Sequence, residues 1–316
     1  MPQTHPPRTQ TKTKPAHTNP PSRPLSVVAA GCGPQPWQTS GGGARVATWL
    51  LERLAGREAD LVILSELALT PFFSVTRERS WLEAGESLDG PELAAVAEVA
   101  ASIGSYVLVG FAERERGTGV LFNSAVLAGP DGSLVEGRFC SGPHAGEPTR
   151  VYRKVHLSEN WNADPGVHEK YFFRSGHGFV VYETAFGLFA PLICYDRSFP
   201  ESWRAVRLAG ARVVGLPTAF SRPERIRTFE LELQAAAMQN GLFVIAASKR
   251  GTESSAGGVA VDYAGGSCIV SPLGDVLARG GSSSDGELVS YVVDLGLFDD
   301  YDRTYHLLRD RRPDAY

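Results

Sequence analysis

The stretch GLFAPLICYDRSFPESWRAVRLAGARVVGLPT, residues 187–218, contains the pattern that decides the fold. Residues 187–194 and 212–218 are apolar runs typical of buried strands. Between them, residues 199–211 predict a helix with Pro200 in its first turn, where a helix tolerates proline. A strand, a helix and a second strand in this order predict sheets covered by helices, which is an α/β fold.

The same alternation continues on both sides of this stretch. Expected strands are 25–31, 59–66, 105–114, 122–137 (broken by the turn at 129–132), 243–248 and 288–295, with a hairpin at 267–280. Expected helices are 41–56, 90–104 and 227–241. No internal repeat and no linker interrupts the pattern, so one domain is expected over residues 25–316.

Composition excludes several classes of protein. The chain has 316 residues, is 43% hydrophobic and carries a formal charge of -4, so neither nucleic acid nor an anionic membrane is expected as a partner. No apolar window is long enough to span a membrane. The four cysteines form no CxxC pair, which favours free thiols and a cytoplasmic protein. Residues 1–24 are rich in proline and contain no acid, so a disordered tail is expected there.

Three ionisable residues lie at the ends of expected apolar strands or within them. Glu66 closes one strand, Lys154 lies within VYRKVHL, and Cys194 closes the strand at 187–194. An attacking thiol needs a base, which Glu66 supplies in this interpretation. Lys154 and the backbone N–H of Tyr195 then stabilise the oxyanion. On spacing alone, a buried Glu–Lys ion pair beside a core cysteine is the alternative.

The segments that carry these residues resemble a known family. LVILSELALTPFF (61–73), VYRKVHL (151–157) and LICYDRSFPESWR (192–204) are similar to the three signature segments of the nitrilase superfamily, the carbon–nitrogen hydrolases. FNSAVLAGPDG, DPGVHEKYFFRSG, QNGLFVIAAS and GGSCIVSPLGDVLA add to the resemblance, which covers residues 25 to 296.

The resemblance implies a fold and a set of roles. It implies a four-layer α-β-β-α sandwich, no metal, no organic cofactor, and a catalytic triad of Glu66, Lys154 and Cys194. It also implies that Glu169 supports the lysine and the substrate. A homodimer or higher homo-oligomer is implied, packed through the helices that flank the nucleophile strand. Apolar residues expected on that surface are Trp203, Val206, Leu231 and Met238.

Two features depart from the family pattern. Ser65 stands where the family usually has proline before the glutamate, so the turn loses that rigidity. About a dozen extra residues (138–150) precede the lysine segment. Their Gly, Pro and Ser content predicts a surface loop that borders the pocket. Cys140 and His144 within it match no common zinc spacing, so no metal site is expected.

The substrate expected from the resemblance is a small ureido (N-carbamoyl) compound, because DPGVHEKYFF resembles the corresponding loop of N-carbamoyl amidohydrolases. Arg197 is the candidate for holding a substrate carboxylate, with an ion pair to Glu201 as the structural alternative. Tyr195, His168 and Thr218 are the other candidate substrate contacts. A carboxamide or a nitrile remains an alternative substrate, and an inactive interaction subunit is the alternative that is not an enzyme.

Overall fold

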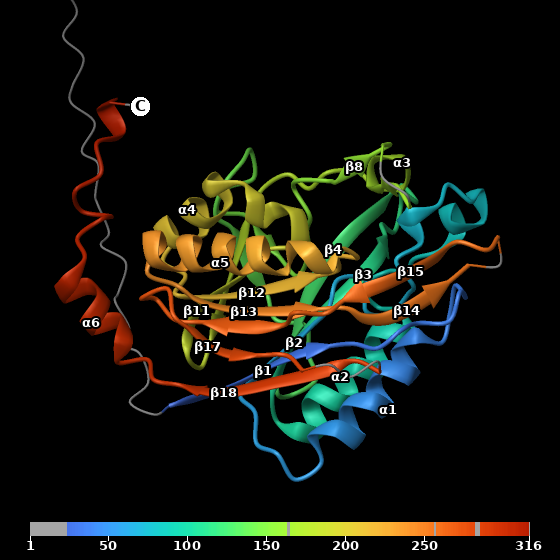
Figure 1. The fold of residues 1–316 in the computed structure, drawn as a ribbon, viewed down its shortest axis with the longest axis horizontal. Helices are drawn as coiled ribbons and strands as arrows, with labels where there is room; N and C mark the ends of the chain where they lie inside the picture. The colour runs from blue at the N-terminus through green and yellow to red at the C-terminus, as the bar shows by residue number, and fades with distance from the viewer. Residues whose placement is uncertain (1–23, 163–164, 256, 282–284, 316) are drawn as a thin grey trace, which may run out of the picture.

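The computed structural model describes residues 24–162, 165–255, 257–281 and 285–315. The tail expected over 1–24 therefore lies outside the described residues, except for Pro24. Figure 1 shows helices, a sheet, a second sheet and further helices stacked in that order. This arrangement confirms the predicted α-β-β-α sandwich.

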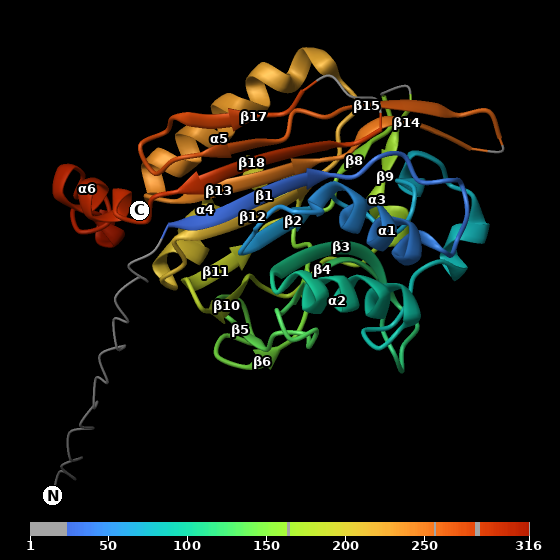
Figure 2. The same cartoon turned by 90° about the horizontal axis from the view of Figure 1, so that it is seen from below.

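The first sheet holds six strands within the described residues, in the order β18-β1-β2-β3-β4-β7. Their bounds are Glu287–Val293, Leu25–Gly31, Leu61–Leu64, Tyr106–Arg114, Leu121–Ala128 and Tyr152–Arg153. Figure 2 shows α1 (Gly42–Leu54) and α2 (Pro91–Ile103) together on the outer face of this sheet. Pro91 begins α2, and Gly104 ends it with a φ of 64° that glycine adopts without steric cost.

The second sheet holds eight strands within the described residues, in the order β17-β16-β13-β12-β11-β10-β5-β6. Their bounds are Val276–Arg279, Cys268–Val270, Phe243–Ser248, Val213–Thr218, Gly187–Pro191, Val180–Thr184, Gly137–Phe139 and Pro148–Thr149. Helices α4 (Pro200–Leu208) and α5 (Ile226–Asn240) cover its outer face. The strand–helix–strand unit of residues 187–218 is thus β11, α4 and β12.

The two sheets pack closely through their apolar inner faces. Leu61 and Ile63 of β2 belong to the same buried cluster as Val214 and Leu216 of β12. A Cβ atom at Gly215 would lie within 2.9 Å of side chains from both sheets, those of Phe189, Ile63 and Leu108. A glycine is therefore needed where β12 crosses the first sheet.

The extra segment 138–150 is not the pocket-bordering loop that its composition predicts. β5 and β6 pair with each other, and β5 pairs with β10, so the segment extends the second sheet at its edge. The prediction missed this because the strands are short and lie on either side of a glycine-rich turn. None of these residues lines the cavity described below.

The expected contact surface on α4 and α5 also needs correction. Trp203 and Val206 are buried within the subunit, because α4 turns these side chains toward the second sheet. The large apolar side chains exposed on these helices are Leu208 and Leu231, each 53% exposed.

Several short elements have no counterpart in the predicted pattern. They are β8 (Glu159–Asn160), β9 (Val167–His168), α3 (Glu169–Phe172), β10, the hairpin of β14 (Arg250–Ser254) and β15 (Ala260–Ala264), and α6 (Leu297–Thr304). Figure 1 shows α6 to one side of the sheets. Among the described helices, none has the length and apolar character needed to cross a membrane.

Candidate active site

Three segments that leave strands of the two sheets converge on one place. Glu66 follows β2, Lys154 follows β7, and Cys194 comes three residues after β11. The Nζ atom of Lys154 lies 2.6 Å from Oε1 of Glu66, and its charge acts on the Cys194 thiol. The structure therefore brings together the three residues that the sequence singles out.

The apolar run predicts that Cys194 ends a strand, but in the structure the strand ends before it. β11 stops at Pro191, and Cys194 begins the 3₁₀ turn η3 (Cys194–Ser198). The carboxylate of Asp196 accepts the N–H of Ile193 at 3.0 Å, so this N–H is withdrawn from sheet pairing. The chain therefore turns out of the sheet and presents the cysteine at its edge.

Asp196 also ties the cysteine turn to the lysine segment. Its carboxylate accepts hydrogen bonds from the hydroxyl of Tyr152 at 2.6 Å and the backbone N–H of His156 at 3.0 Å. Tyr152 and His156 lie two residues before and after Lys154. This buried carboxylate thus fixes the position of Cys194 relative to Lys154.

The backbone is strained at two points of the site. Among the described residues other than glycine, only Cys194 and Leu67 have positive φ angles, of 43° and 48°. A left-handed conformation costs a residue with a side chain about 1 kcal/mol or more. One strained residue presents the thiol, and the other directly follows Glu66, so the strain is confined to the candidate site.

Lys154 is the centre of a buried polar cluster. Its Nζ atom donates to Oε1 of Glu66 at 2.6 Å and to both carboxylate oxygens of Glu169 at 2.8 Å. The side-chain amide of Asn123 donates to Oε1 of both glutamates at 2.8 Å. The N–H of Ser158 donates to Glu169 at 2.6 Å. All of the cluster's ionised side chains are almost fully buried, so each depends on these partners.

This environment determines where protons are held. Burial alone would lower the pKa of Lys154, but the charges of Glu169, Glu66 and Cys194 outweigh it and raise that pKa above its ordinary value. Lys154 therefore stays cationic. Burial raises the pKa of Glu169, and Lys154 opposes that shift. The carboxyl groups of Glu66 and Glu169 therefore share a single ammonium group.

Glu66 has one oxygen without a partner. Its Oε1 atom is engaged by Lys154 and Asn123, whereas Oε2 is buried and has no hydrogen bond to the described residues. An unpaired buried carboxylate oxygen is costly. It is also the position from which a carboxylate takes a proton from a neighbouring group.

The Cys194 thiol is held in its protonated form. Burial and the negative charge of Glu66 raise its pKa, while Lys154 and Arg197 act in the opposite direction. Its Sγ atom lies 3.6 Å from the carbonyl oxygen of Ala219. A thiol in this state needs a base before it can attack a substrate.

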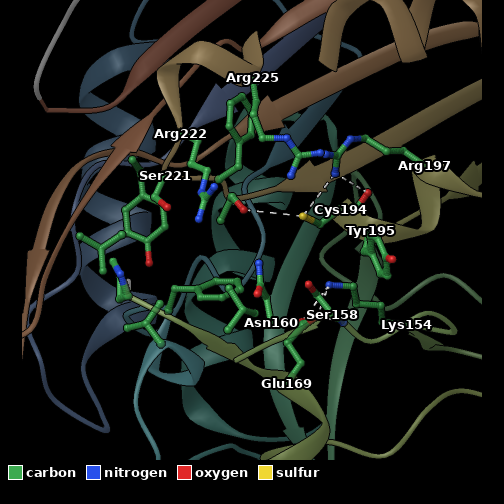
Figure 3. A pocket seen from close by; sticks show the side chains of 18 residues that line it. Lys154, Ser158, Asn160, Glu169, Cys194, Tyr195, Arg197, Ser221, Arg222 and Arg225 are labelled. Atoms are coloured by element: carbon green, nitrogen blue, oxygen red, sulfur yellow. Dashed lines mark hydrogen bonds and ion pairs between the residues drawn. The ribbon is translucent and has the colours of Figure 1, made fainter. Parts of the chain in front are cut away.

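A cavity of about 140 Å³ opens beside this cluster (Figure 3). Lys154, Glu169 and Cys194 line it, together with the predicted substrate contacts Tyr195 and Arg197. Its apolar wall comes from side chains of several elements: Phe72, Val75, Val167, Phe220, Val261 and Tyr263. A pocket with an apolar wall and a few converging polar groups suits a small polar substrate.

The backbone N–H of Tyr195 lies at the start of η3. The first backbone hydrogen bond that closes this turn runs from the N–H of Asp196 to the carbonyl of Ile193 at 3.0 Å. Tyr195 precedes it, and the first N–H groups of a helical turn have no partner within that turn. This N–H is therefore available beside Cys194.

Arg197 has a different partner from the one that its spacing suggests. Its Nε atom is 2.8 Å from the carboxylate of Glu232 on α5, and Glu201 does not pair with it in the described structure. Its Nη1 atom donates to the carbonyl of Cys194 at 2.9 Å and lies 3.6 Å from Sγ. The i,i+4 argument failed because Arg197 lies in η3 and Glu201 in α4, so the two residues do not share one helix.

His168 and Thr218 do not line the cavity. The Nδ1 atom of His168 is 3.2 Å from the carboxylate of Glu159, in the short β8–β9 hairpin. The carbonyl of Thr218 accepts the N–H of Glu66 at 3.4 Å, and its hydroxyl is buried within β12. Both residues thus lie outside the lining of this cavity, where the sequence had suggested substrate contacts.

The described residues contain no group of three or more His, Cys, Asp and Glu side chains arranged to hold a metal ion. The four cysteines, Cys32, Cys140, Cys194 and Cys268, are all free thiols. Cys140 and Cys268 are shielded, and burial raises their pKa values to about 11 and about 12.

Sequence reasoning missed several residues of the site. Asn123 and Ser124 interrupt an apolar strand, and a buried amide in such a run was the available signal. Asp196 adjoins the cysteine, but its hydrogen bonds depend on the tertiary fold. Arg222 and Arg225 line the cavity from the loop after β12, where no periodic pattern marks them.

Comparison with known proteins agrees with this geometry. The family model described as carbon-nitrogen hydrolase matches residues 27–302. The chain is 29% identical to a nitrilase of Pyrococcus abyssi over 272 residues, covering 84% of this chain and 90% of that protein. It is 27% identical to an N-carbamoylputrescine amidase of Arabidopsis thaliana over 278 residues, covering 84% and 86%.

A solved structure shows the same fold. The crystal structure of a carbon-nitrogen hydrolase from Helicobacter pylori superposes with a TM-score of 0.77 at 25% identity, covering 93% of this chain and 97% of that chain. This chain belongs to the carbon–nitrogen hydrolase family. The predicted resemblance to the nitrilase superfamily is thereby confirmed.

Proposed function

We propose that this protein hydrolyses a small ureido (N-carbamoyl) compound, with Cys194 as nucleophile, Glu66 as base and Lys154 as oxyanion stabiliser. The observation that carries the proposal is the buried cluster of Lys154, Glu66 and Glu169 beside the strained Cys194 at the cavity. A thiol and an ammonium at the cavity wall, with the carboxylate of Glu66 paired to that ammonium, match the needs of acyl transfer.

The first half of the reaction forms a bond to sulfur. The free Oε2 atom of Glu66 takes the proton of the thiol, and Sγ attacks the carbonyl carbon of the substrate. Negative charge develops on the former carbonyl oxygen, where the ammonium of Lys154 and the N–H of Tyr195 stabilise it. The intermediate then expels one nitrogen, which takes the proton from Glu66 and leaves as ammonia or an amine.

The second half regenerates the thiol. Glu66 takes a proton from water, and the resulting hydroxide attacks the carbonyl carbon bound to sulfur. The C–S bond breaks and the thiolate takes the proton back from Glu66. From a ureido substrate the released carbamate decomposes to carbon dioxide and the second nitrogen compound. Glu169 serves throughout by holding Lys154 in place and cationic.

A carboxamide fits the same steps and is the alternative substrate. It would form a thioester and release an acid and ammonia. A nitrile is a further alternative, and one relative is named as a nitrilase. The ureido assignment is favoured by the loop resemblance at residues 164–173 and by a relative named N-carbamoylputrescine amidase.

A substrate screen tests the proposal. Purified protein is incubated with matched ureas, carboxamides and nitriles, and ammonia release is measured. Turnover of ureas with the highest kcat/KM supports the proposal, whereas a preference for carboxamides or nitriles contradicts its ureido part. Intact-mass detection of a carbamoyl or acyl adduct on Cys194 tests the nucleophile, and an inactive interaction subunit would form none.

The expected assembly and compartment remain part of this proposal. We expect a homodimer or a higher homo-oligomer, with the exposed Leu208 and Leu231 at the contact. We also expect a cytoplasmic enzyme without a cofactor, in keeping with four free thiols. Sedimentation of the wild type and Leu231→Glu would test the contact, because the charge should weaken the assembly.

A further inference from the structure

We infer that Arg222 and Arg225 form a subsite for an anionic group, a carboxylate, at the end of the substrate remote from the bond that is cleaved. This inference rests on the proposed function, because it assumes that the substrate occupies the cavity beside Cys194. It narrows the substrate class from ureido compounds in general to ureido acids.

The two arginines are cations without counterions. Both line the cavity. Throughout the described part of the chain, no ion pair or hydrogen bond engages either guanidinium. Arg197, the third arginine of the lining, already has the carboxylate of Glu232 as its counterion and donates a further hydrogen bond to the carbonyl of Cys194. The positive charge available to a ligand therefore lies on Arg222 and Arg225.

Local geometry places the two side chains together. Arg222 precedes the 3₁₀ turn η4 (Pro223–Arg225), and its carbonyl accepts the N–H of Arg225 at 2.9 Å. Arg222 and Arg225 thus lie at the two ends of one short turn, and both line the same cavity. Pro223 fixes the backbone between them. In Figure 3 both arginines lie on one side of Cys194, with Lys154 and Glu169 on the other.

The distribution of charge discriminates between ligands. Within the described lining, Glu169 is the sole acidic residue, and Lys154 already engages it. A substrate ammonium would therefore meet two guanidinium groups and no free carboxylate. A substrate carboxylate could instead accept paired hydrogen bonds from a guanidinium fork. The arrangement favours a ureido acid over a ureido amine.

A matched substrate series tests this inference. A series of ω-ureido acids of increasing chain length identifies the best acid, which is compared with the ureido alcohol and ureido amine of equal length. For the wild type, kcat/KM should be highest for the acid and lowest for the amine. The KM for the acid should rise with ionic strength, because salt screens exposed charges.

Variants assign the preference to the two arginines. In Arg222→Ala/Arg225→Ala, the ratio of kcat/KM for acid over alcohol should fall by about tenfold or more, and the salt dependence should weaken. Arg222→Lys/Arg225→Lys should keep part of the ratio. Arg227→Ala is the matched control, since Arg227 is exposed at the start of α5, two residues beyond η4, but does not line the cavity. Its ratio should equal that of the wild type.

The outcomes separate this inference from the proposed function. An unchanged ratio in the double alanine variant, or a wild type that prefers the amine, overturns the subsite while turnover of the ureido alcohol still supports the proposed function. If no urea is hydrolysed but carboxamides are, the ureido assignment fails. The ratio of kcat/KM is then measured for an ω-amic acid over its hydroxyl analogue. A fall of this ratio in the double alanine variant supports the subsite, and an unchanged ratio overturns it.

Discussion

Two buried lysines pair with carboxylates in this molecule, and they differ in how completely they are satisfied. Lys249, fully buried at the end of β13, donates to Glu253 at 2.7 Å and to the carbonyls of Leu67 and Thr70 at 3.3 and 2.9 Å. Glu253 accepts further N–H groups from Gln35 and Phe72. The charge of Lys249 is balanced by that of Glu253, and every polar side-chain atom of these two residues has a partner.

The cluster around Lys154 is not balanced. One ammonium serves two carboxylates, an oxygen of Glu66 has no partner, and the cluster borders a cavity. Buried polar groups are normally satisfied. The cluster of Lys249 and Glu253, here called the sealed cluster, follows this rule. The cluster of Lys154, Glu66 and Glu169, here called the open cluster, departs from it and borders the cavity.

The sealed cluster also supports the open one. Lys249 holds the carbonyl of Leu67, the strained residue that directly follows Glu66. A Cβ atom at Gly110 of β3 would lie 2.8 Å from the carbonyl oxygen of Ser65, so this loop packs directly on the strand. The ion pair of Lys249 and Glu253 thereby helps to hold the strained backbone at Leu67. The turn lacks the rigidity of a proline, because serine stands at position 65.

The largest expected effect comes from removing the proposed nucleophile beside the open cluster. Cys194→Ala should lower kcat/KM by at least about 10⁴-fold, since covalent catalysis cannot proceed without the thiol. The fold should persist, because alanine introduces no larger side chain. Ammonia release and circular dichroism check both parts. Cys32→Ala, Cys140→Ala and Cys268→Ala are the controls, and activity retained in Cys194→Ala would reject the assignment.

A matched pair of amide substitutions sharpens the comparison between the clusters. Glu66→Gln should lower kcat by about 10³-fold, because an amide cannot accept the thiol proton. The free energy of unfolding should change by less than about 1 kcal/mol, since Glu169 still balances Lys154. Glu253→Gln should instead cost about 3–5 kcal/mol, because it leaves Lys249 as a buried charge without a counterion.

Denaturant unfolding and single-turnover kinetics separate the two outcomes. At a temperature where it is folded, Glu253→Gln should keep kcat within about tenfold of the wild type. Equal stability losses in both variants would show that the two clusters play the same structural role. The contrast between them would then carry no functional meaning.

The sequence predicted the layers and the three central residues for identifiable physical reasons. Apolar runs and proline at helix starts are local signals, so the element order and an α/β fold could be predicted from them, whereas the four-layer sandwich was implied by the resemblance to the nitrilase superfamily. Glu66, Lys154 and Cys194 were marked by charge or thiol chemistry beside apolar strands. The ion-pair partner of Arg197 was wrong, because Glu232 lies 35 residues away on α5 and only tertiary packing brings the two together. The edge hairpin of β5 and β6 and the cavity arginines likewise depend on tertiary contacts.

A change of cation at the open cluster should have a somewhat smaller effect. Lys154→Arg keeps the charge but replaces a compact ammonium with a larger planar group in a fully buried position. We expect kcat to fall by about 10²-fold to 10³-fold, as when an oxyanion donor is lost. Single-turnover rates check this. A variant with wild-type kcat would show that Lys154 serves only as an ion-pair partner of the two glutamates.

The smallest expected effect is the response to alkaline pH. The two glutamates and Cys194 hold the pKa of Lys154 above its ordinary value of 10.5 despite the opposing effect of burial. Because the folded pKa exceeds the unfolded one, the stability from this cluster is fully present below pH 10.5 and is lost only as pH rises through the higher folded value. The profile of kcat/KM between pH 8 and 10 should therefore change by less than about twofold. Thermal stability is measured at the same pH values as a control. If kcat/KM falls in this range while thermal stability does not, Lys154 loses its proton in the catalytic state. The charge assigned to Lys154 in the open cluster would then be wrong.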